Sequence, residues 1–170
     1  MGTRSRIGIE RADGTVTSIY CHWDGYPSHN GRILVENYTT EAKINKLMKL
    51  GGLSSLDVEI GTKHDFDKKV DGECNAYGRD RGEKDVAAQT SANAGAMFFE
   101  ATEGWEEYAY LYRGGCWYYS EVGGQCGPFM GRAVRAIRWR SVADAVARAD
   151  AARVVREAKE AAERAAEVVA

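Results

Sequence analysis

The feature that most constrains the fold is the end of the chain, because residues 141–169 contain no glycine and no proline. This segment consists mostly of Ala, Val, Arg and Glu, and Ser141 with Asp144 resembles a helix capping box in which Asp replaces the usual Glu. The pattern predicts one long helix from about Ser141. Its narrow apolar stripe, which includes Val142 and Val155, is typical of a surface that packs on the body or on a partner helix. We expect the helix to mediate self-association.

Two hairpins are predicted before this helix. Residues 4–10 and 15–23 read as strands on either side of Asp13-Gly14, a pair typical of a tight turn. Residues 106–112 read EEYAYLY and, after Arg113 and two glycines, CWYYSEV returns as the partner strand. We expect an antiparallel sheet that pairs the first two strands and includes the hairpin of residues 106–122.

Helices are expected near residues 30–38 and 40–50, covering one face of the sheet, and a short helix is expected at residues 92–103. The predicted class is α+β, with an antiparallel sheet, helices on one face and a long C-terminal helix. We expect residues 1–131 to form the α+β ligand-binding domain and residues 132–170 to form a helical C-terminal extension.

The bulk composition excludes several classes of partner. The formal net charge is -2, so no global basic field is present to hold duplex nucleic acid. Basic and aromatic residues interleave at residues 132–140, where a helix start or an oligomer contact is favoured over a nucleic-acid contact, because acidic residues follow. No apolar run is long enough for a signal peptide or a membrane span, so we expect a cytoplasmic protein that contacts no membrane.

Metal and catalytic sites have little support in the sequence. The four cysteines are widely spaced, and we interpret them as reduced, mostly buried thiols. The three histidines match no established ligand spacing. The adjacent His64 and Asp65 resemble a phosphohydrolase dyad, but two adjacent residues do not define such a site. Nucleophile-elbow and Walker-loop patterns are not found. We therefore expect no metal, no cofactor and no enzymatic activity.

A candidate ligand-binding set remains on two segments without regular structure. A Trp and a Tyr in the first segment offer flat faces for a base, and two Arg in the second offer forked donors for phosphate. An Asp in each segment offers acceptors for ribose hydroxyls or an amino group. Each residue also has an ordinary structural interpretation, as a cap on the core, an Asx turn or a bridge between loops. Together they favour a pocket for a small anionic nucleotide. The predicted residues are Trp23, Asp24, Tyr26, Arg79, Asp80 and Arg81.

Four segments carry a resemblance to a known group: RSRIGIERADGTVTSIYCHWDGYPSHNGRIL, LGGLSSL, YGRDRGE and EEYAYLYRGGCWYYSEV. Over residues 4–122 the chain is similar to a family of small phage-encoded proteins, and through them it resembles the Thoeris anti-defence sponge proteins. Those proteins sequester cyclic ADP-ribose isomers and deny the signal to a bacterial defence effector. The resemblance implies an oligomer that binds a cyclic nucleotide without cleaving it. It further implies that Trp23 stacks on the base while Arg79 and Arg81 hold the pyrophosphate.

Two other functions stay open at this point. The first is a protein-binding inhibitor of a host defence enzyme, acting through the aromatic hairpin or the C-terminal helix. The second is a small hydrolase that uses His22 or His64 with an aspartate, for which the chain shows no recognisable catalytic set.

Overall fold

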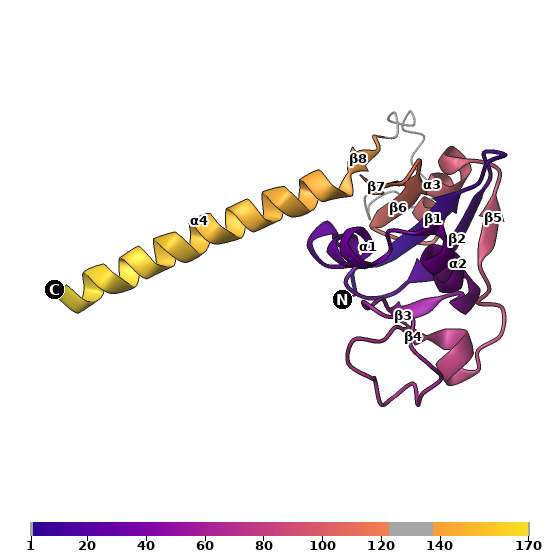
Figure 1. Ribbon diagram of the computed structural model, residues 1–170, viewed down its shortest axis with the longest axis horizontal. Coiled ribbons are helices and arrows are strands. Elements are labelled where there is room, and N and C mark those ends of the chain that lie inside the picture. The colour runs from indigo at the N-terminus through magenta and orange to yellow at the C-terminus, as the bar shows by residue number, and fades with distance from the viewer. Residues whose placement is uncertain (1, 123–137, 170) are drawn as a thin grey trace.

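A computed structural model of the protein describes residues 2–122 and 138–169, with the side chains of residues 165–169 left aside. A mixed sheet of eight strands forms its centre, in the order β4-β3-β2-β1-β6-β7-β8, and β5 pairs with β2 outside this order (Figure 1). The strands are β1 (Ser5–Glu10), β2 (Val16–Cys21), β3 (Leu53–Ser55), β4 (Asn75–Ala76), β5 (Gln89–Ser91), β6 (Tyr108–Arg113), β7 (Cys116–Glu121) and β8 (Arg140–Ser141). With the helices described next, this sheet confirms the predicted α+β class.

The sheet is not purely antiparallel, which corrects the expected arrangement. Both predicted hairpins form, β1 with β2 and β6 with β7. The second hairpin joins the first through a parallel pairing of β1 with β6, in which Ser5 lies opposite Tyr108 and Ile9 lies opposite Tyr112. β2 and β3 also pair in parallel, at Cys21 and Leu53. Local turn residues determine pairing within each hairpin, whereas the direction in which two hairpins meet depends on long-range packing.

Helices cover both faces of the sheet. The helices are α1 (Arg32–Asn37), α2 (Glu41–Leu50), α3 (Ala94–Glu103) and α4 (Val142–Val169). α1, α2 and the start of α4 share one buried cluster with Ile7, Ile19 and Tyr110, as expected for the two early helices. α3 packs on the opposite face, in a second cluster with Val16 and Leu111. Helices on one face only were expected, so α3 on the opposite face corrects that arrangement.

Two helices begin at a side-chain cap near the predicted residue, and a third begins differently. Thr40 caps α2 by accepting a hydrogen bond from the Lys43 amide at 3.3 Å, and Ser141 accepts one from the Asp144 amide at 3.2 Å. The helix expected from residue 30 begins differently. A π-helical turn, η1 (Pro27–Gly31), precedes α1, and the side-chain Nδ2 of the buried Asn30 donates to the Trp23 carbonyl at 3.1 Å.

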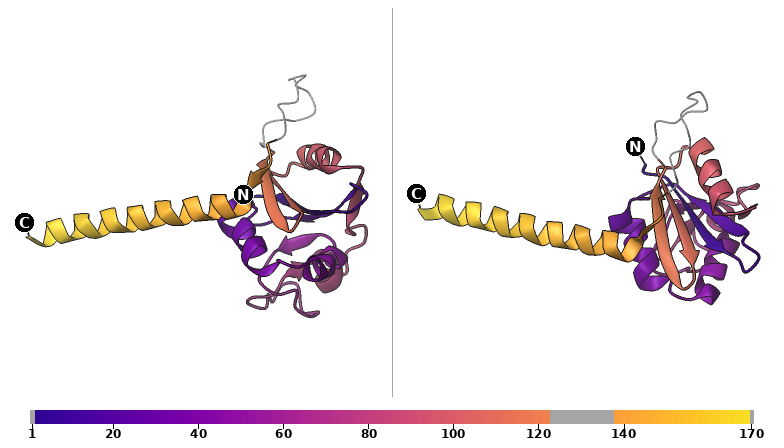
Figure 2. Two further views of the ribbon diagram at one scale, coloured as in Figure 1. Left: turned by 45° about the horizontal axis from the view of Figure 1, so that its top comes forward. Right: turned by 90° about the horizontal axis from the view of Figure 1, so that it is seen from above.

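The predicted long C-terminal helix is confirmed, and it projects away from the sheet (Figures 1 and 2). Only its first turns contact the body: Val142 and Val146 are buried, and Asp150 forms an ion pair with Arg32 at 2.5 Å. Side chains 151–164 are all exposed. Within the described ranges, no helix combines the length and the apolar character needed to cross a membrane. The expected boundary after residue 131 lies outside the described residues, as do Cys126 and most of the basic patch at residues 132–140.

Candidate functional site

The outer edge of β2 changes partners along its length. β5 pairs with its first half, where Ser18 lies opposite Gln89, and β3 pairs with it only at Cys21. Ile19 and Tyr20 therefore have no strand partner on this edge among the described residues. A groove of about 410 Å³ lies at this gap. Its volume falls in the range of small-molecule pockets, roughly 300–1,000 Å³.

The groove combines flat aromatic surface with a buried, unpaired hydroxyl. Tyr20 from β2 and Tyr77 from the turn that follows β4 both line it, together with Glu83 and Asp85. Ser18 also lines the groove; its side chain is fully buried, and its hydroxyl has no hydrogen-bond partner among the described residues. Buried hydroxyls are normally paired, so Ser18 places an unsatisfied polar group in the wall of the groove, out of reach of a bound molecule.

A buried ion pair supports the floor of the groove. Arg6 donates from Nε and Nη2 to Glu106 Oε1, at 3.1 and 2.7 Å, and from Nη1 to Gln89 Oε1 at 2.6 Å. Burial raises the pKa of Glu106 above its usual value, although the charge of Arg6 opposes the shift. The pair links β1, β5 and the residues before β6. Arg6 thus joins β1 to β5 through Gln89 and to the residues before β6 through Glu106.

A row of aromatic side chains leads from the groove to the end of β2. The Tyr20 hydroxyl lies 2.7 Å from His22 Nδ1, and the His22 ring contacts the Trp23 ring edge-on at 4.7 Å between centroids. Burial raises the pKa of Tyr20 to about 12 against the opposing charge of Arg4. Burial also lowers the pKa of His22, and Arg4 adds to that shift. At neutral pH this row is uncharged.

The three predicted residues of the first segment lie together on the turn after β2. Trp23 is 42% exposed, Tyr26 is also exposed, and Asp24 has a backbone φ of 57° that few residues other than glycine adopt. The Gly25 amide donates to the Thr3 carbonyl at 2.7 Å and fixes this turn against the N-terminal segment. None of the three lines the groove; Trp23 contacts His22, and His22 contacts the groove residue Tyr20.

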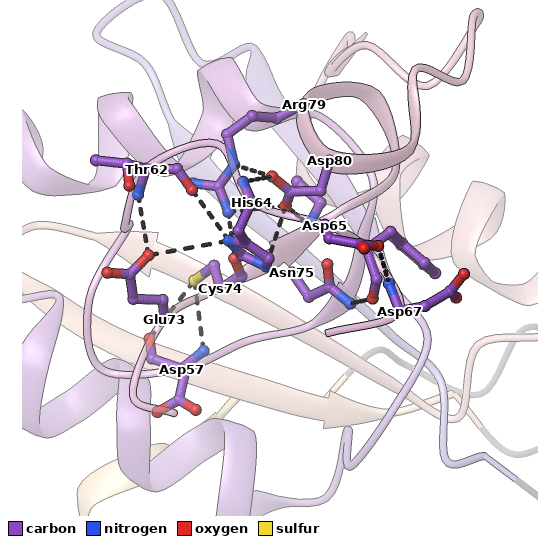
Figure 3. A network of polar contacts seen from close by, with 12 residues as sticks. Asp57, Thr62, His64, Asp65, Asp67, Glu73, Cys74, Asn75, Arg79 and Asp80 are labelled. Carbon is purple, nitrogen blue, oxygen red and sulfur yellow. Dashed lines mark hydrogen bonds and ion pairs between the residues drawn. The ribbon is translucent and has the colours of Figure 1, made fainter. Parts of the chain in front are cut away.

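Arg79 is engaged by the chain itself (Figure 3). Its Nε and Nη2 donate to the Asp80 carboxylate at 2.7 and 2.8 Å, and its Nη1 donates to the Ile60 carbonyl at 2.6 Å. Nη2 also donates to the Cys74 carbonyl. All three guanidinium nitrogens thus bind groups of residues 60–80. The predicted phosphate contact of Arg79 would require some of these bonds to break.

Asp80 is the centre of the same polar cluster. Its carboxylate is fully buried and accepts hydrogen bonds from the amides of Ala76 at 2.7 Å and His64 at 3.2 Å. Burial alone raises the pKa of Asp80, but Arg79 and the two amides outweigh it and hold that pKa below its usual value. His64 Nε2 lies 3.7 Å from Asp80, whereas Asp65 accepts from the Asp67 amide at 3.1 Å. The contacts of His64 thus run to Asp80 and not to its sequence neighbour.

Arg81 does not line the groove but supports Tyr77, which does. Its guanidinium lies over the Phe66 ring at 5.2 Å, and Phe66 stacks on Tyr77 with centroids 5.4 Å apart. Arg81 also forms an ion pair with Glu83 at 3.1 Å. The turn η2 (Tyr77–Arg81) thus carries a groove residue at its start and the residue that supports it at its end.

Sequence reasoning missed the groove residues Arg6, Ser18, Tyr20, Tyr77 and Gln89. One signal was present: Arg6 is a charged residue inside an otherwise buried strand, and such residues are almost always paired. The others come together only through the register of β2 with β3 and β5.

Comparison with known proteins adds no identification. No family model, no curated protein and no solved structure matches the chain. Within residues 2–122 and 138–169, no group of three or more His, Cys, Asp or Glu side chains is arranged to hold a metal ion. Cys21 and Cys74 are buried and free, and Cys116 is free and exposed.

Proposed function

We propose that this protein binds and sequesters a small nucleotide signal of the cyclic ADP-ribose type without cleaving it, and that the groove beside β2 is its binding site. One observation carries the proposal. The groove places two tyrosine rings around a space of about 410 Å³, and an unpaired serine hydroxyl lies buried in its wall. Pockets of this size, mostly apolar with a few polar groups, are typical of small-molecule sites.

The chemistry of the groove suits the base and ribose parts of such a ligand. The rings of Tyr20 and Tyr77 offer stacking surfaces for a base. Glu83 and Asp85 offer acceptors for ribose hydroxyls. In this proposal the cluster around Asp80 holds the turn that carries Tyr77, so Arg79 acts on the site through position and not through direct contact.

The biological setting follows from the sequence resemblance. We propose that the protein is a phage anti-defence factor that acts in the host cytoplasm as a homo-oligomer. Removing a signal from solution needs only tight binding, so no catalytic group is required in this role.

The test is to identify what the protein retains. The purified full-length chain is mixed with each linkage isomer of cyclic ADP-ribose, free ligand is removed by gel filtration, and the protein is heated. Mass spectrometry of the released material should show the intact isomer. Altered ligand would indicate a hydrolase, and no released ligand for any isomer would contradict the proposal.

A matched pair of variants locates the site. Tyr77→Ala removes a ring from the groove and should reduce the retained ligand, whereas Tyr118→Ala removes the same ring from β7 and should retain as much as the parent. Equal loss in both variants would contradict the assignment to the groove.

A second function, inhibition of a partner protein, is favoured by one observation. Phe99 on α3 and Trp105 just after it are more than half exposed, and Trp105 has a backbone φ of 60°. Exposed aromatic side chains are typical anchors of protein interfaces. Phe99→Ala with Trp105→Ala should leave nucleotide retention unchanged and weaken inhibition only if this second function holds.

A further inference from the structure

The segment that connects η2 to β5 forms one wall of the groove. It covers residues 83–88, and we call it the strap. A second cavity, of about 440 Å³, lies beside the groove. Four strap residues line both cavities, namely Glu83, Asp85, Val86 and Ala87. The strap therefore separates the two cavities, and it has space on either side into which it can move.

Few contacts hold the strap in its present position. The Gly52 amide donates to the Val86 carbonyl at 2.6 Å, and the Glu83 amide donates to the Tyr77 carbonyl at 3.0 Å. Most of the strap residues are exposed, and the others are only half-buried. Asp85 has a backbone φ of 62°, which few residues other than glycine adopt. Segments with so few buried apolar contacts move at a low cost in free energy.

The main-chain amide of Tyr20, on the strand that borders the groove, has no hydrogen-bond partner among the described residues. The His22 amide donates to the Leu53 carbonyl at 3.0 Å, so it points toward the outer edge of β2. Amides of alternate residues in a strand point to the same edge, so the Tyr20 amide points there as well. Main-chain amides in folded proteins are normally paired, which makes Tyr20 an open position in the sheet.

The pairing of β5 with β2 would fill this position if it continued by two residues. Ser18 lies opposite Gln89, so the same register places Ala87 opposite Tyr20. In the structure β5 begins at Gln89, and the strap precedes it without pairing. The Ala87 carbonyl has no hydrogen-bond partner within residues 2–122 and 138–169. A free donor and a free acceptor therefore lie on two walls of the same groove, in register with each other.

We propose that the strap closes the groove by extending β5 until the Ala87 carbonyl accepts a hydrogen bond from the Tyr20 amide. Closure exchanges the bond between Gly52 and Val86 for this new one, and it lets Asp85 leave its strained backbone conformation. The closed strap fills the space that a ligand needs, so the strap and the ligand compete for the groove. The proposal rests on the groove assigned in the proposed function, but its first test needs no nucleotide.

Disulfide trapping tests whether the strap reaches β2. Residues paired in this register have Cα atoms about 5.5 Å apart, a separation that a disulfide spans. In the full-length chain with Cys116 and Cys126 changed to Ser, Tyr20→Cys with Ala87→Cys should form an intramolecular disulfide on mild oxidation, which peptide mass spectrometry detects. Tyr20→Cys with Asp85→Cys is out of register and should form far less. No disulfide at position 87, or equal yields at both positions, would overturn the proposal.

A second disulfide holds the strap open and tests its competition with the ligand. A Cβ atom at position 52 would lie 3.5 Å from the Val86 Cβ atom. This separation suits a disulfide, so Gly52→Cys with Val86→Cys, in the same background, should fix the strap where the structure has it. Calorimetry should show that the oxidised form binds the cyclic ADP-ribose isomer retained by the parent at least as tightly as the reduced form, because no closed fraction competes.

The trapped closed chain provides the opposite case. Oxidised Tyr20→Cys with Ala87→Cys should bind the same isomer at least about tenfold more weakly than its own reduced form. Weaker binding by the chain that is locked open would overturn the proposal, because it would mean that the ligand needs the strap to leave Gly52. If the parent retains no isomer, the proposed function fails, and the yields of the two trapping pairs still decide whether the strap closes.

Discussion

Arg6 in β1 and Glu106, which precedes β6, form a buried ion pair. Both side chains are almost completely buried, and the second carboxylate oxygen of Glu106 has no hydrogen-bond partner among the described residues. Removing one partner of such a pair leaves the other charge buried without compensation, which typically costs about 3–5 kcal/mol. The same ion pair therefore stabilises the protein and positions Arg6, which lines the groove.

The first prediction concerns this pair. Arg6→Met should lower the free energy of unfolding by about 3–5 kcal/mol, because Glu106 loses its partner. Arg113→Met breaks an exposed ion pair with Glu10 and should cost about 0–1 kcal/mol. Urea unfolding of both variants at pH 7 measures the difference. Similar losses in the two proteins would show that burial of Arg6 has no energetic weight.

The second prediction concerns the pH dependence of the same carboxyl group. The pKa of Glu106 is raised above its usual value, so folding favours the protonated form. Its contribution to stability is therefore fully present below the unfolded pKa of 4.5 and is lost as the pH rises through the raised pKa. The stability of the parent relative to Glu106→Gln should fall across that window. A relative stability that is constant or rises with pH would contradict this sign.

At the scale of elements, local signals in the sequence predicted most of the fold. The Asp13-Gly14 turn, the Thr40 cap and the Ser141 cap all form because each depends on residues within a few positions. The parallel pairing of β1 with β6 depends on segments about one hundred residues apart, and no local pattern encodes it. The groove was missed for the same reason, since β3 and β5 reach the edge of β2 only through long-range register.

The predicted site residues show the same limit. Trp23, Asp24 and Tyr26 are neighbours in sequence and do lie on one turn. The residue types of Arg79 and Asp80 suit a nucleotide and therefore predict ligand contacts. In the structure their groups bind each other and the surrounding backbone. The chemical type of a side chain is visible in the sequence, but its partners are not.

The third prediction tests the cluster that holds the turn η2. Asp80→Asn removes the charge that Arg79 binds and should lower the free energy of unfolding by about 3 kcal/mol. Because the pKa of Asp80 lies below its usual 3.8, the stabilisation is present above pH 3.8 and is lost as the pH falls through the lowered pKa. Thermal melts between pH 3 and 7 measure both effects. Asp65→Asn, at an exposed carboxylate, should leave the melting temperature nearly unchanged at pH 7.

The fourth prediction tests the assignment of the start of α4 to the body. Val142 is fully buried, so Val142→Ala should cost roughly 2 kcal/mol through lost burial and a small cavity. Val70→Ala makes the same change at an exposed position and should stay within about 0.5 kcal/mol of the parent. Chemical unfolding provides the comparison. Equal stability of the two variants would mean that α4 is not part of the folded body.

At the scale of the whole molecule, a mixed sheet carries two separate surfaces with different proposed tasks. The groove lies beside β2, whereas α4 extends away from the body after its first turns, with side chains 151–164 exposed (Figure 1). No residue belongs to both surfaces. Ligand capture and self-association can therefore be measured independently, and a monomeric variant should still bind one ligand per chain.

The central claim is that the groove, and not the turn after β2, binds the nucleotide. Isothermal titration calorimetry with the isomer that the protein retains, on the parent, Tyr77→Ala and Trp23→Ala, tests it most directly. Stacking on an aromatic ring is worth about 1–3 kcal/mol per base, and about 1.4 kcal/mol is tenfold in affinity. Tyr77→Ala should raise the Kd at least about tenfold. Trp23→Ala should change it less than about threefold, because the Trp23 ring contacts His22 and does not line the groove. A protein that binds as tightly as the parent without Tyr77, but loses its ligand without Trp23, would contradict the account.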